Sequence, residues 1–461
     1  MLRDKEYLRT LVRLAVPITV QYFILNALNA VDVMMIGQLG DTPVAGVGLA
    51  NEIFFLLGLT VFGITSGSAI FTAQFWGKKD LPNLRRVIGV SLATSMLVVA
   101  FFVTVAIAFP QSALRLYTTD PAVIALGSQY LRIVGFCYLP WAVTATFAAV
   151  LRSTENIKLP MLVSIGALSL NTLLNYTLIL GNFGFPALGV KGAAIATLIA
   201  RSLECAVLLG FTYLKKTPAA ATLHEMFNFK TGFLKKFFRT TLPVIINEGL
   251  WALGITTYSA VYARIGTEAI AAINVARAIE SLVFVFFNGI GIACAIMVGN
   301  KIGAGDEQTA FQYGKRSLQL SIAVALLVGV LLMLTSGSII SLYQISEASQ
   351  GFARRILLIA GLSLWVRGSN MTIFIGMLRS GGDTRYAFFT ELFTIWGVGV
   401  PMALLSAFVF HLPVYWVYLA VLSDELIKFV VGALRVFSKR WINNLVHSIG
   451  TPLQPEPLPG E

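Results

Sequence analysis

The sequence has few charged residues and few of the residue types that build enzyme or metal sites. Of its 461 residues, 12% are charged and 57% are hydrophobic. A soluble globular protein has about 25% charged residues, so this chain lacks the polar surface that such a protein needs. Apolar runs of about 20 residues, each long enough to span a bilayer, recur along its whole length. The composition therefore predicts an all-α, polytopic membrane protein.

Cysteine and histidine are scarce, and their positions exclude several kinds of site. Cys137, Cys205 and Cys294 all lie in apolar runs, and their spacing fits neither a disulfide framework nor a metal site. The three histidines lie in predicted loops or in the C-terminal tail. The sequence has no nucleophile–base arrangement, glycine-rich phosphate loop or ATPase motif. We therefore expect neither an enzyme nor a bound cofactor.

The net charge of +12 is distributed unevenly between the predicted loops. Lys and Arg gather in the loops that begin near residues 78, 151, 301 and 378, whereas the intervening loops contain almost none. This is the positive-inside pattern of membrane proteins, so the charge does not imply a nucleic-acid partner. Both termini fall on the basic side, and we expect both to be cytoplasmic.

Hydropathy and loop signals together predict twelve transmembrane spans. These lie near residues 11–37, 45–75, 87–110, 121–150, 160–181, 190–214, 237–263, 268–299, 316–338, 346–378, 386–409 and 412–437.

The first six spans are repeated in the second six. At a shift of 226 residues Pro17 matches Pro243, and after one inserted residue the motif at 151–153 matches Leu-Arg-Ser at 378–380. Because six is even, both copies enter the membrane in the same direction, and the pseudo-twofold axis lies along the membrane normal. Two equal six-helix lobes facing a central cleft are expected, with alternating access to the two sides of the membrane.

The repeat also defines a domain division. We predict an N-lobe, a cytoplasmic linker ending in an interfacial amphipathic helix, a C-lobe, and a Pro-rich disordered tail. These parts comprise residues 1–214, 215–236, 237–440 and 441–461, respectively.

Asp32 is an acid within the first span. A charge at the centre of a membrane helix costs about 2.5–3.5 kcal/mol on insertion scales, so its presence requires a reason. Asn26, Asn29 and Tyr22 share a broad polar face with Asp32. This arrangement favours a binding site, although a helix-end charge that reaches the interface would also explain Asp32.

Glu248 is a second acid in an apolar run, with no basic residue within eight positions. Tyr258 shares its helical face, and a carboxylate beside aromatic rings suits a cation. The alternative is an acid paired with a buried base from another helix. At the repeat shift, Asp32 falls on Tyr258 and Tyr22 falls on Glu248, so each lobe has an acid where the other has a tyrosine. We therefore expect two non-equivalent sites facing the cleft.

Three further polar residues lie within predicted spans. Asn171 and Asn175 are four residues apart on one face, where their amides would bind a substrate or ion, or join helices. Arg367 is twelve residues from the nearest Arg on either side and has no local acid. It would neutralise an acid on a neighbouring helix or bind an anionic substrate.

Other intramembrane charges are spaced as pairs within single helices. We expect these pairs to be structural, because residues three apart neutralise each other on one helix. The pairs are Arg201 with Glu204, Arg277 with Glu280, and Glu425 with Lys428.

Several of these segments carry a resemblance to a known family. AVDVMMIGQLGDTPVAGVGLA, LPVIINEG, NTLLN followed by LGVKGAAIATLIAR, and the paired LRS loops resemble the MATE (multidrug and toxic-compound extrusion) transporters. The resemblance covers about residues 10–440. It implies twelve helices in two lobes around a V-shaped cleft, and antiport of organic cations against Na⁺ or H⁺. It also implies a monomer in contact with membrane lipids, in the bacterial inner membrane.

The resemblance also assigns roles to individual residues. Asp32 matches the family's acid in span one, Asn171 an asparagine in span five and Thr197 a threonine in span six. These three would hold Na⁺ if the protein is sodium-coupled. Glu248 matches the acid that the NorM-like branch has in span seven.

Two departures leave the coupling ion open. Asn175 stands where the DinF-like branch often has an acid, and Gly368 where the NorM-like branch has an acid in span ten. Our main hypothesis is a cation-coupled drug antiporter in which Asp32 and Glu248 alternate between ion and substrate. The alternative is a flippase or exporter for a lipid-linked or other anionic amphiphile, whose phosphate Arg367 and Arg277 would hold.

Overall fold

The computed structural model describes residues 5–447, and these residues form helices without any β-strand. Ten helical segments are long and apolar enough to cross a membrane. Two further segments, one in span seven and one in span twelve, complete a twelve-span arrangement in two halves. The predicted fold class is therefore confirmed.

The N-lobe contains spans one to six, with two short helical segments, α4 and η2, in its connections. Its elements are α1 (Lys5–Gly37), α2 (Asp41–Gly77), α3 (Leu81–Ala108), α4 (Pro110–Arg115), α5 (Pro121–Val134), η1 (Gly135–Cys137), α6 (Tyr138–Ser153), α7 (Lys158–Leu178), η2 (Asn182–Gly184) and α8 (Val190–Leu214). The segments α5, η1 and α6 follow one another directly and form span four.

The C-lobe contains spans seven to twelve. Its elements are α10 (Thr231–Ile265), α11 (Thr267–Gly303), α12 (Glu307–Ile340), α13 (Glu347–Asn370), η3 (Met371–Arg379), α14 (Thr384–Leu392), η4 (Phe393–Gly399), α15 (Val400–Leu404), η5 (Leu405–Val409), α16 (Val414–Val421) and α17 (Ser423–Phe437). The segments η3, η4 and η5 are π-helical. Spans ten and eleven therefore contain wider turns that the matching spans of the N-lobe lack.

Several helices begin earlier than hydropathy predicts, because local caps extend them beyond the apolar run. Asp80 accepts a hydrogen bond from the backbone of Asn83 at the start of α3. Its repeat equivalent, Asp306, caps α12 through Thr309 in the same way. Each cap satisfies a backbone N–H that the first turn of a helix leaves unpaired.

Residues 215–230 connect the lobes and contain the short helix α9 (Leu223–Phe227). A capping box between Thr222 and Glu225 starts this helix, and Arg85 of α3 forms an ion pair with Glu225. The backbone N–H of Thr222 is the main cause that lowers the pKa of the Glu225 carboxyl. Since α10 begins at Thr231, its first turns lie within the segment that we assigned to the linker.

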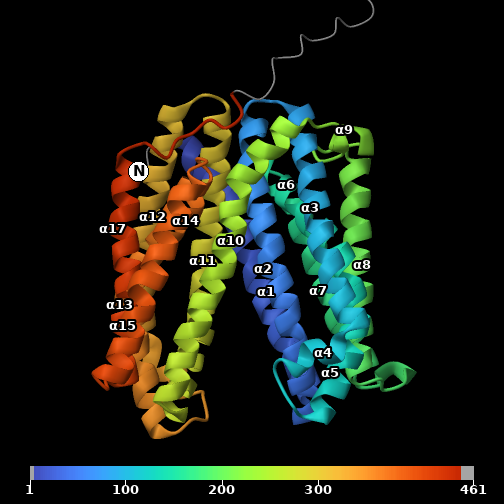
Figure 1. Cartoon of the computed structure of the whole chain (residues 1–461), viewed down its shortest axis with the longest axis vertical. Coiled ribbons are helices and arrows are strands. Elements are labelled where there is room, and N and C mark those ends of the chain that lie inside the picture. The colour runs from blue at the N-terminus through green and yellow to red at the C-terminus, as the bar shows by residue number, and fades with distance from the viewer. Residues whose placement is uncertain (1–4, 448–461) are drawn as a thin grey trace, which may run out of the picture.

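The two lobes lean together at one end and diverge at the other (Figure 1). At the end where they meet, α2 packs against α10 and α11. A Cβ atom at Gly77 would lie 1.9 Å from the carbonyl oxygen of Asn300, and one at Gly303 would lie 1.9 Å from that of Gln74. Only glycine permits such an approach of two backbones. The basic loops that begin near 78, 301 and 378 belong to this end, which we call the inner end.

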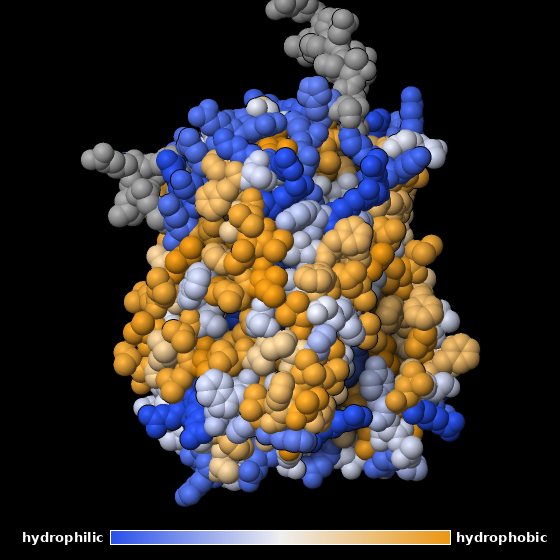
Figure 2. Space-filling view, turned by 60° about the vertical axis from the view of Figure 1, so that its left-hand side comes forward, coloured by the Kyte–Doolittle hydropathy of each residue, from blue (hydrophilic) through white to orange (hydrophobic). Residues whose placement is uncertain are grey.

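A broad apolar belt crosses the visible face of the molecule between two hydrophilic ends (Figure 2). Leu97, Leu334 and Leu434 belong to the large apolar side chains exposed on the helices, each more than 65% exposed. Such a belt is unfavourable in water and matches the hydrocarbon core of a bilayer. The surface therefore agrees with a multi-pass membrane protein.

The predicted disorder of the tail after Trp441 is wrong for residues 441–447; residues 448–461 lie outside the described part of the chain. Trp441 is fully buried, and its ring packs on Gly381. The backbone of Leu445 donates to Gln74 of α2, and Asn444 donates to the carbonyl of Ile302 of α11. Burial of the indole and the hydrogen bonds of these amides order the segment despite its polar composition. The segment therefore bridges both lobes at the inner end.

The close contact at Gly77 leads to a test of lobe movement. Gly77→Val should separate the lobes at the inner end and bring their outer ends closer together, because a side chain cannot fit against Asn300. Spin labels at Leu116 and Leu342, which are 85% and 81% exposed on the two lobes, would report a shorter distance.

The control is Gly58→Val on the same helix, since a Cβ atom there would have no atom within 4 Å. An unchanged label distance in Gly77→Val, with the protein still folded, would contradict this account of the lobe contact.

Candidate functional site

Asp32 lies in a pocket inside the N-lobe, where α1 faces α7 and α8. Asn175 donates to one carboxylate oxygen of Asp32 at 2.9 Å. In the amide orientation that satisfies both of its partners, Asn171 donates to the other oxygen at 2.9 Å and accepts from the backbone N–H of Thr197 at 3.2 Å. The acid is thus held by two neutral amides from one face of α7.

The pocket has a cavity volume of about 260 Å³ and contains most of the polar residues predicted in this lobe. Asn29 and Thr197 line it with the Asp32 group, and Asn51 extends it to α2. Arg201 also lines it, but its guanidinium is paired with Glu204 at 2.8 Å. No ion pair joins Asp32 to a basic side chain in residues 5–447. The carboxylate can therefore bind a cation without first breaking a salt bridge.

Small residues on α8 let this pocket form. Ala193 and Ala200 line it and are almost fully buried. A Cβ atom at Gly192 would lie 2.3 Å from the carbonyl of Leu178, so α7 and α8 approach closely beside the pocket. Close backbone approach through small residues is typical of helix packing in membranes.

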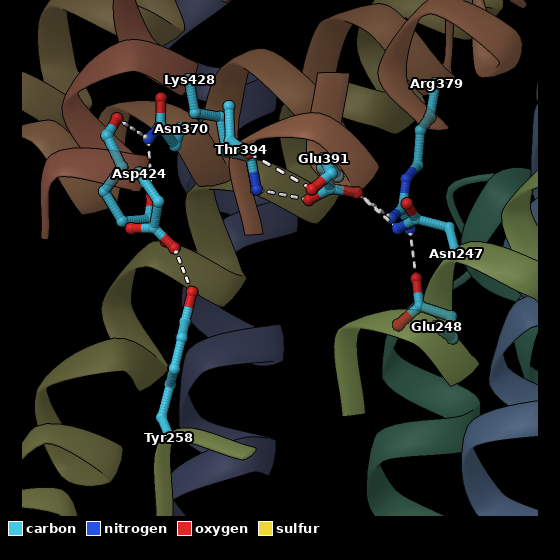
Figure 3. A network of polar contacts seen from close by, with 10 residues as sticks. Asn247, Glu248, Tyr258, Asn370, Arg379, Glu391, Thr394, Asp424 and Lys428 are labelled. Carbon is cyan, nitrogen blue, oxygen red and sulfur yellow. Dashed lines mark hydrogen bonds and ion pairs between the residues drawn. The ribbon is translucent and has the colours of Figure 1, made fainter. Parts of the chain in front are cut away.

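The C-lobe contains a chain of buried charges instead of an open acid (Figure 3). Glu248 of α10 accepts from Arg379 at 2.7 Å, and Arg379 also contacts Glu391 of α14 at 3.3 Å. Lys428 of α17 forms an ion pair with the same Glu391, and Asn247 donates to it. This charge chain joins spans seven, ten, eleven and twelve.

Tyr258 lies in the same lobe but belongs to a different contact. Its hydroxyl donates to Asp424 at 2.8 Å, next to Gly399 of the π-helical segment η4. A Cβ atom at Gly399 would lie 1.9 Å from the tyrosine oxygen, so glycine is needed for this hydrogen bond to form. Nearby, Asn370 donates to Glu425 at 2.6 Å.

Arg367 has an acidic partner that sequence spacing did not reveal. It forms a two-point ion pair with Glu280 of α11, at 2.9 and 3.2 Å, and it donates to Tyr418. The predicted pair of Arg277 with Glu280 is therefore wrong, and Arg277 donates instead to Ser259 at 2.7 Å.

The other two in-helix pairs differ in outcome. Lys428 pairs with Glu391 rather than Glu425, because α17 turns it towards span eleven. The pair of Arg201 with Glu204 is confirmed at 2.8 Å.

The predicted site residues thus fall into three places. One group shares the N-lobe pocket: Asn29, Asp32, Asn171, Asn175 and Thr197. Tyr22 lines a second pocket, between the lobes. Glu248, Tyr258 and Arg367 each have a charged partner within the C-lobe. Glu248 is 7% exposed and is paired with Arg379. This contact matches the alternative hypothesis for Glu248, an acid paired with a buried base from another helix.

Sequence reasoning missed several charged residues. Arg379 was assigned to a loop, yet it is 5% exposed at the end of η3. Glu391 lies close to the predicted start of span eleven and was not singled out. Glu52 is exposed on α2 beside Asn51, and it satisfies the criterion that selected Glu248, an acid far from any base. That criterion, applied throughout, would have found Glu52.

The oxygen atoms around Asp32 fit a hard cation only in part. Hard cations are coordinated by carboxylate, amide and hydroxyl oxygens. The described residues contain no group of three or more His, Cys, Asp or Glu side chains that could hold a metal ion. The Oδ1 atom of Asn175 is buried without a hydrogen-bond partner, so one amide oxygen is free to bind a cation.

Comparisons with known proteins agree with this architecture. The model of the MatE family matches residues 17–177 and 243–405, one segment in each lobe. The chain is 26% identical to the uncharacterized transporter YisQ of Bacillus subtilis, over 95% of this chain and 96% of the relative. It is 27% identical to the multidrug resistance protein NorM of Burkholderia vietnamiensis, over 86% of each chain.

Solved structures show the same fold. A crystal structure of a point mutant of the Vibrio cholerae MATE transporter VcmN matches with a TM-score of 0.88 at 19% identity, over 96% of this chain and 99% of that one. A crystal structure of a MATE protein in a bent conformation matches with a TM-score of 0.86 at 18% identity, over 94% and 96%.

The charge chain leads to a stability prediction. Glu391→Gln should destabilise the protein by about 3 kcal/mol, because it leaves Lys428 short of its nearest buried counter-charge. Thermal unfolding of the purified protein would measure the loss as a lower midpoint. The exposed acid Glu347 supplies the control, since Glu347→Gln removes the same charge from a solvated helix end.

The double variant Glu391→Gln with Lys428→Met should recover part of the loss, since no uncompensated ammonium remains. Equal midpoints for Glu391→Gln and Glu347→Gln would contradict the assigned role of the charge chain.

Proposed function

The chain belongs to the MatE family of membrane transporters, whose model matches more than half of it, and we propose that it exports organic cations in exchange for Na⁺ or H⁺. The observation that carries this proposal is Asp32. Its carboxylate lies in a pocket of the N-lobe and is held by two neutral amides rather than by a base. A carboxylate in that state can bind a proton, a sodium ion or an organic cation.

Exchange follows if two cations compete for one carboxylate. When the driving ion binds Asp32 it displaces the substrate cation, and the substrate displaces the ion when the cleft faces the other side. One unit charge moving through 100 mV supplies about 2.3 kcal/mol, which is worth about a fifty-fold concentration difference. Coupling through one carboxylate is therefore sufficient for useful export.

The arrangement of the lobes supports alternating access. Close backbone contacts at Gly77 and Gly303 close the inner end, where the basic loops lie. The positive-inside rule assigns those loops and both termini to the cytoplasm. The described conformation would then face outwards, and rocking of the lobes would expose the pocket to the other side.

The proposed coupling ion is Na⁺ or H⁺, and the two would use different residues. If it is Na⁺, Asp32 with the oxygens of Asn171 and Thr197 would hold it after the Asn171 amide turns. If it is H⁺, Asp32 alone would carry the proton. We propose that Asn29 and Asn175 contact the substrate or ion within the same pocket.

The C-lobe residues have a different proposed role. Glu248 and Arg367 are each held by an opposite charge, and Tyr258 is held by Asp424, so we propose that they keep the C-lobe rigid while the lobes rock. Release of Glu248 from Arg379 during the cycle would give it a direct role as the second acid.

The alternative function, a flippase or exporter of an anionic amphiphile, depended on Arg367 and Arg277. Arg367 is occupied by Glu280, and Arg277 by Ser259. Arg367 is therefore not available to hold a phosphate in this conformation, and Arg277 alone lacks the second guanidinium of that site. The cation exporter is the better supported of the two. We further propose that the protein acts as a monomer in the bacterial inner membrane, surrounded by lipid.

Asp32→Asn should abolish gradient-driven transport, because an amide cannot take up and release a cation in the same way. Uptake of a fluorescent organic cation into everted vesicles would be measured under a Na⁺ gradient and, separately, under a H⁺ gradient. We expect uptake by the unmodified protein under at least one gradient. Uptake by the variant should fall to the level of protein-free vesicles under both.

Asp41→Asn, which removes an exposed acid from the start of α2, is the matched control and should transport normally. Full transport by a correctly folded Asp32→Asn protein would refute the role of this carboxylate.

A further inference from the structure

A second pocket lies where the two lobes meet, towards the inner end. It has a cavity volume of about 130 Å³ and is lined by α1, α2 and α6 of the N-lobe and by α11 and η3 of the C-lobe. Its walls are mainly apolar, with Phe62, Ile70, Ile292, Ile296 and Ile375 among the lining residues. It shares no lining residue with the Asp32 pocket.

This interlobe pocket lies on the pseudo-twofold axis of the repeat. Arg152 and Ser153 line it from one lobe, and their repeat equivalents Arg379 and Ser380 line it from the other. Two arginine residues therefore line one mainly apolar pocket. No Asp or Glu residue is among the lining residues.

The two arginines differ in their partners. Arg379 is neutralised by Glu248 and Glu391. At the repeat shift the position of Glu248 is occupied by Tyr22 in the N-lobe. The position of Glu391, allowing for the one inserted residue, is occupied by Ser164. Both acids that neutralise Arg379 are thus missing around Arg152.

No side chain in the described part of the protein replaces them. The side chain of Arg152 has no ion pair and no hydrogen bond to any residue from 5 to 447. Tyr22 lines the same pocket but has no carboxylate that could replace Glu248. An uncompensated charge among apolar walls is unfavourable, and a bound anion would remove that penalty.

We propose that the interlobe pocket binds the anionic group of an amphiphile, a carboxylate or a phosphate, through Arg152. A guanidinium matches both groups because it donates two parallel hydrogen bonds. The apolar walls accept the hydrocarbon part of the ligand. This site goes beyond the proposed cation export, since it uses another pocket and the opposite ligand charge.

Because the pocket lies between the lobes, a bound ligand would affect how the lobes are joined. Its walls come from both lobes, so an occupant contacts α2 and α6 on one side and α11 and η3 on the other. A ligand that binds only while the lobes are joined at the inner end stabilises that arrangement. Binding should therefore be visible as a rise in thermal stability.

The test uses the purified full-length protein in phosphatidylcholine nanodiscs, with laurate and dodecyl phosphate as anionic probes. Both should raise the unfolding temperature in a concentration-dependent way, whereas uncharged dodecanol should not. Arg152→Gln should weaken the binding of both anions at least tenfold. Arg152→Lys should retain part of it, because an ammonium keeps the charge but loses the two-point contact.

Arg132→Gln is the matched control, since it removes an exposed positive charge from α5 in the same lobe. It should bind the anions as the unmodified protein does. Nanodiscs with phosphatidylglycerol form a second arm. If that lipid raises the unfolding temperature through Arg152 and blocks laurate, the occupant is a membrane lipid, and otherwise it is a free amphiphile.

The proposal fails if dodecanol stabilises the protein as much as the anionic probes do. It also fails if Arg152→Gln and Arg132→Gln lose the same amount of binding. Should Arg152→Gln not fold, Arg152→Lys decides the matter, because unchanged affinity for both anions would exclude a two-point contact. Failure of this test leaves cation transport through Asp32 unaffected, because the two pockets share no lining residue.

Discussion

Compensation of buried charge is the constraint on which the C-lobe depends. A charged side chain inside a membrane is tolerated when an opposite charge meets it within the protein. Arg379 meets this condition twice, through Glu248 and Glu391, and Lys428 completes the chain. Because these residues come from four different spans, the same contacts that neutralise the charges also hold the lobe together as one body.

In the N-lobe the buried acid has no counter-charge, and this difference distinguishes a binding pocket from a structural charge network. Its acid, Asp32, is held by amides and stays accessible from a pocket. In the C-lobe, Glu248, Tyr258 and Arg367 are each bound to a charged partner. Duplication supplied two matching frameworks, and substitutions at equivalent positions made them chemically unlike. Tyr22 in place of Glu248 is the substitution with the widest effect, since it leaves Arg152 without its acid.

Much of the fold could be predicted from the sequence, because hydropathy and the repeat report on the membrane and on the internal symmetry. The exceptions have local causes. The caps at Asp80 and Asp306 extend helices into polar sequence, and the buried indole of Trp441 orders a segment that composition alone marks as disordered. Within the site, the four-residue spacing of Asn171 and Asn175 correctly indicated one polar face. The partner of Arg367 was missed, because Glu280 is 87 residues away along the chain.

The sequence by itself determined the twelve spans, the two lobes and the presence of acids whose burial in a membrane is energetically unfavourable. Those features depend on residue type and periodicity, which are local properties. Only the tertiary structure decided which of these charges are neutralised and which remain available. That outcome depends on which helices pack together. A charge that lies about 3 Å from an opposite charge on another helix forms an ion pair, and a charge without such a neighbour can bind a ligand. Asp32 and Arg152 stay available for that reason, while Glu248 and Arg367 do not.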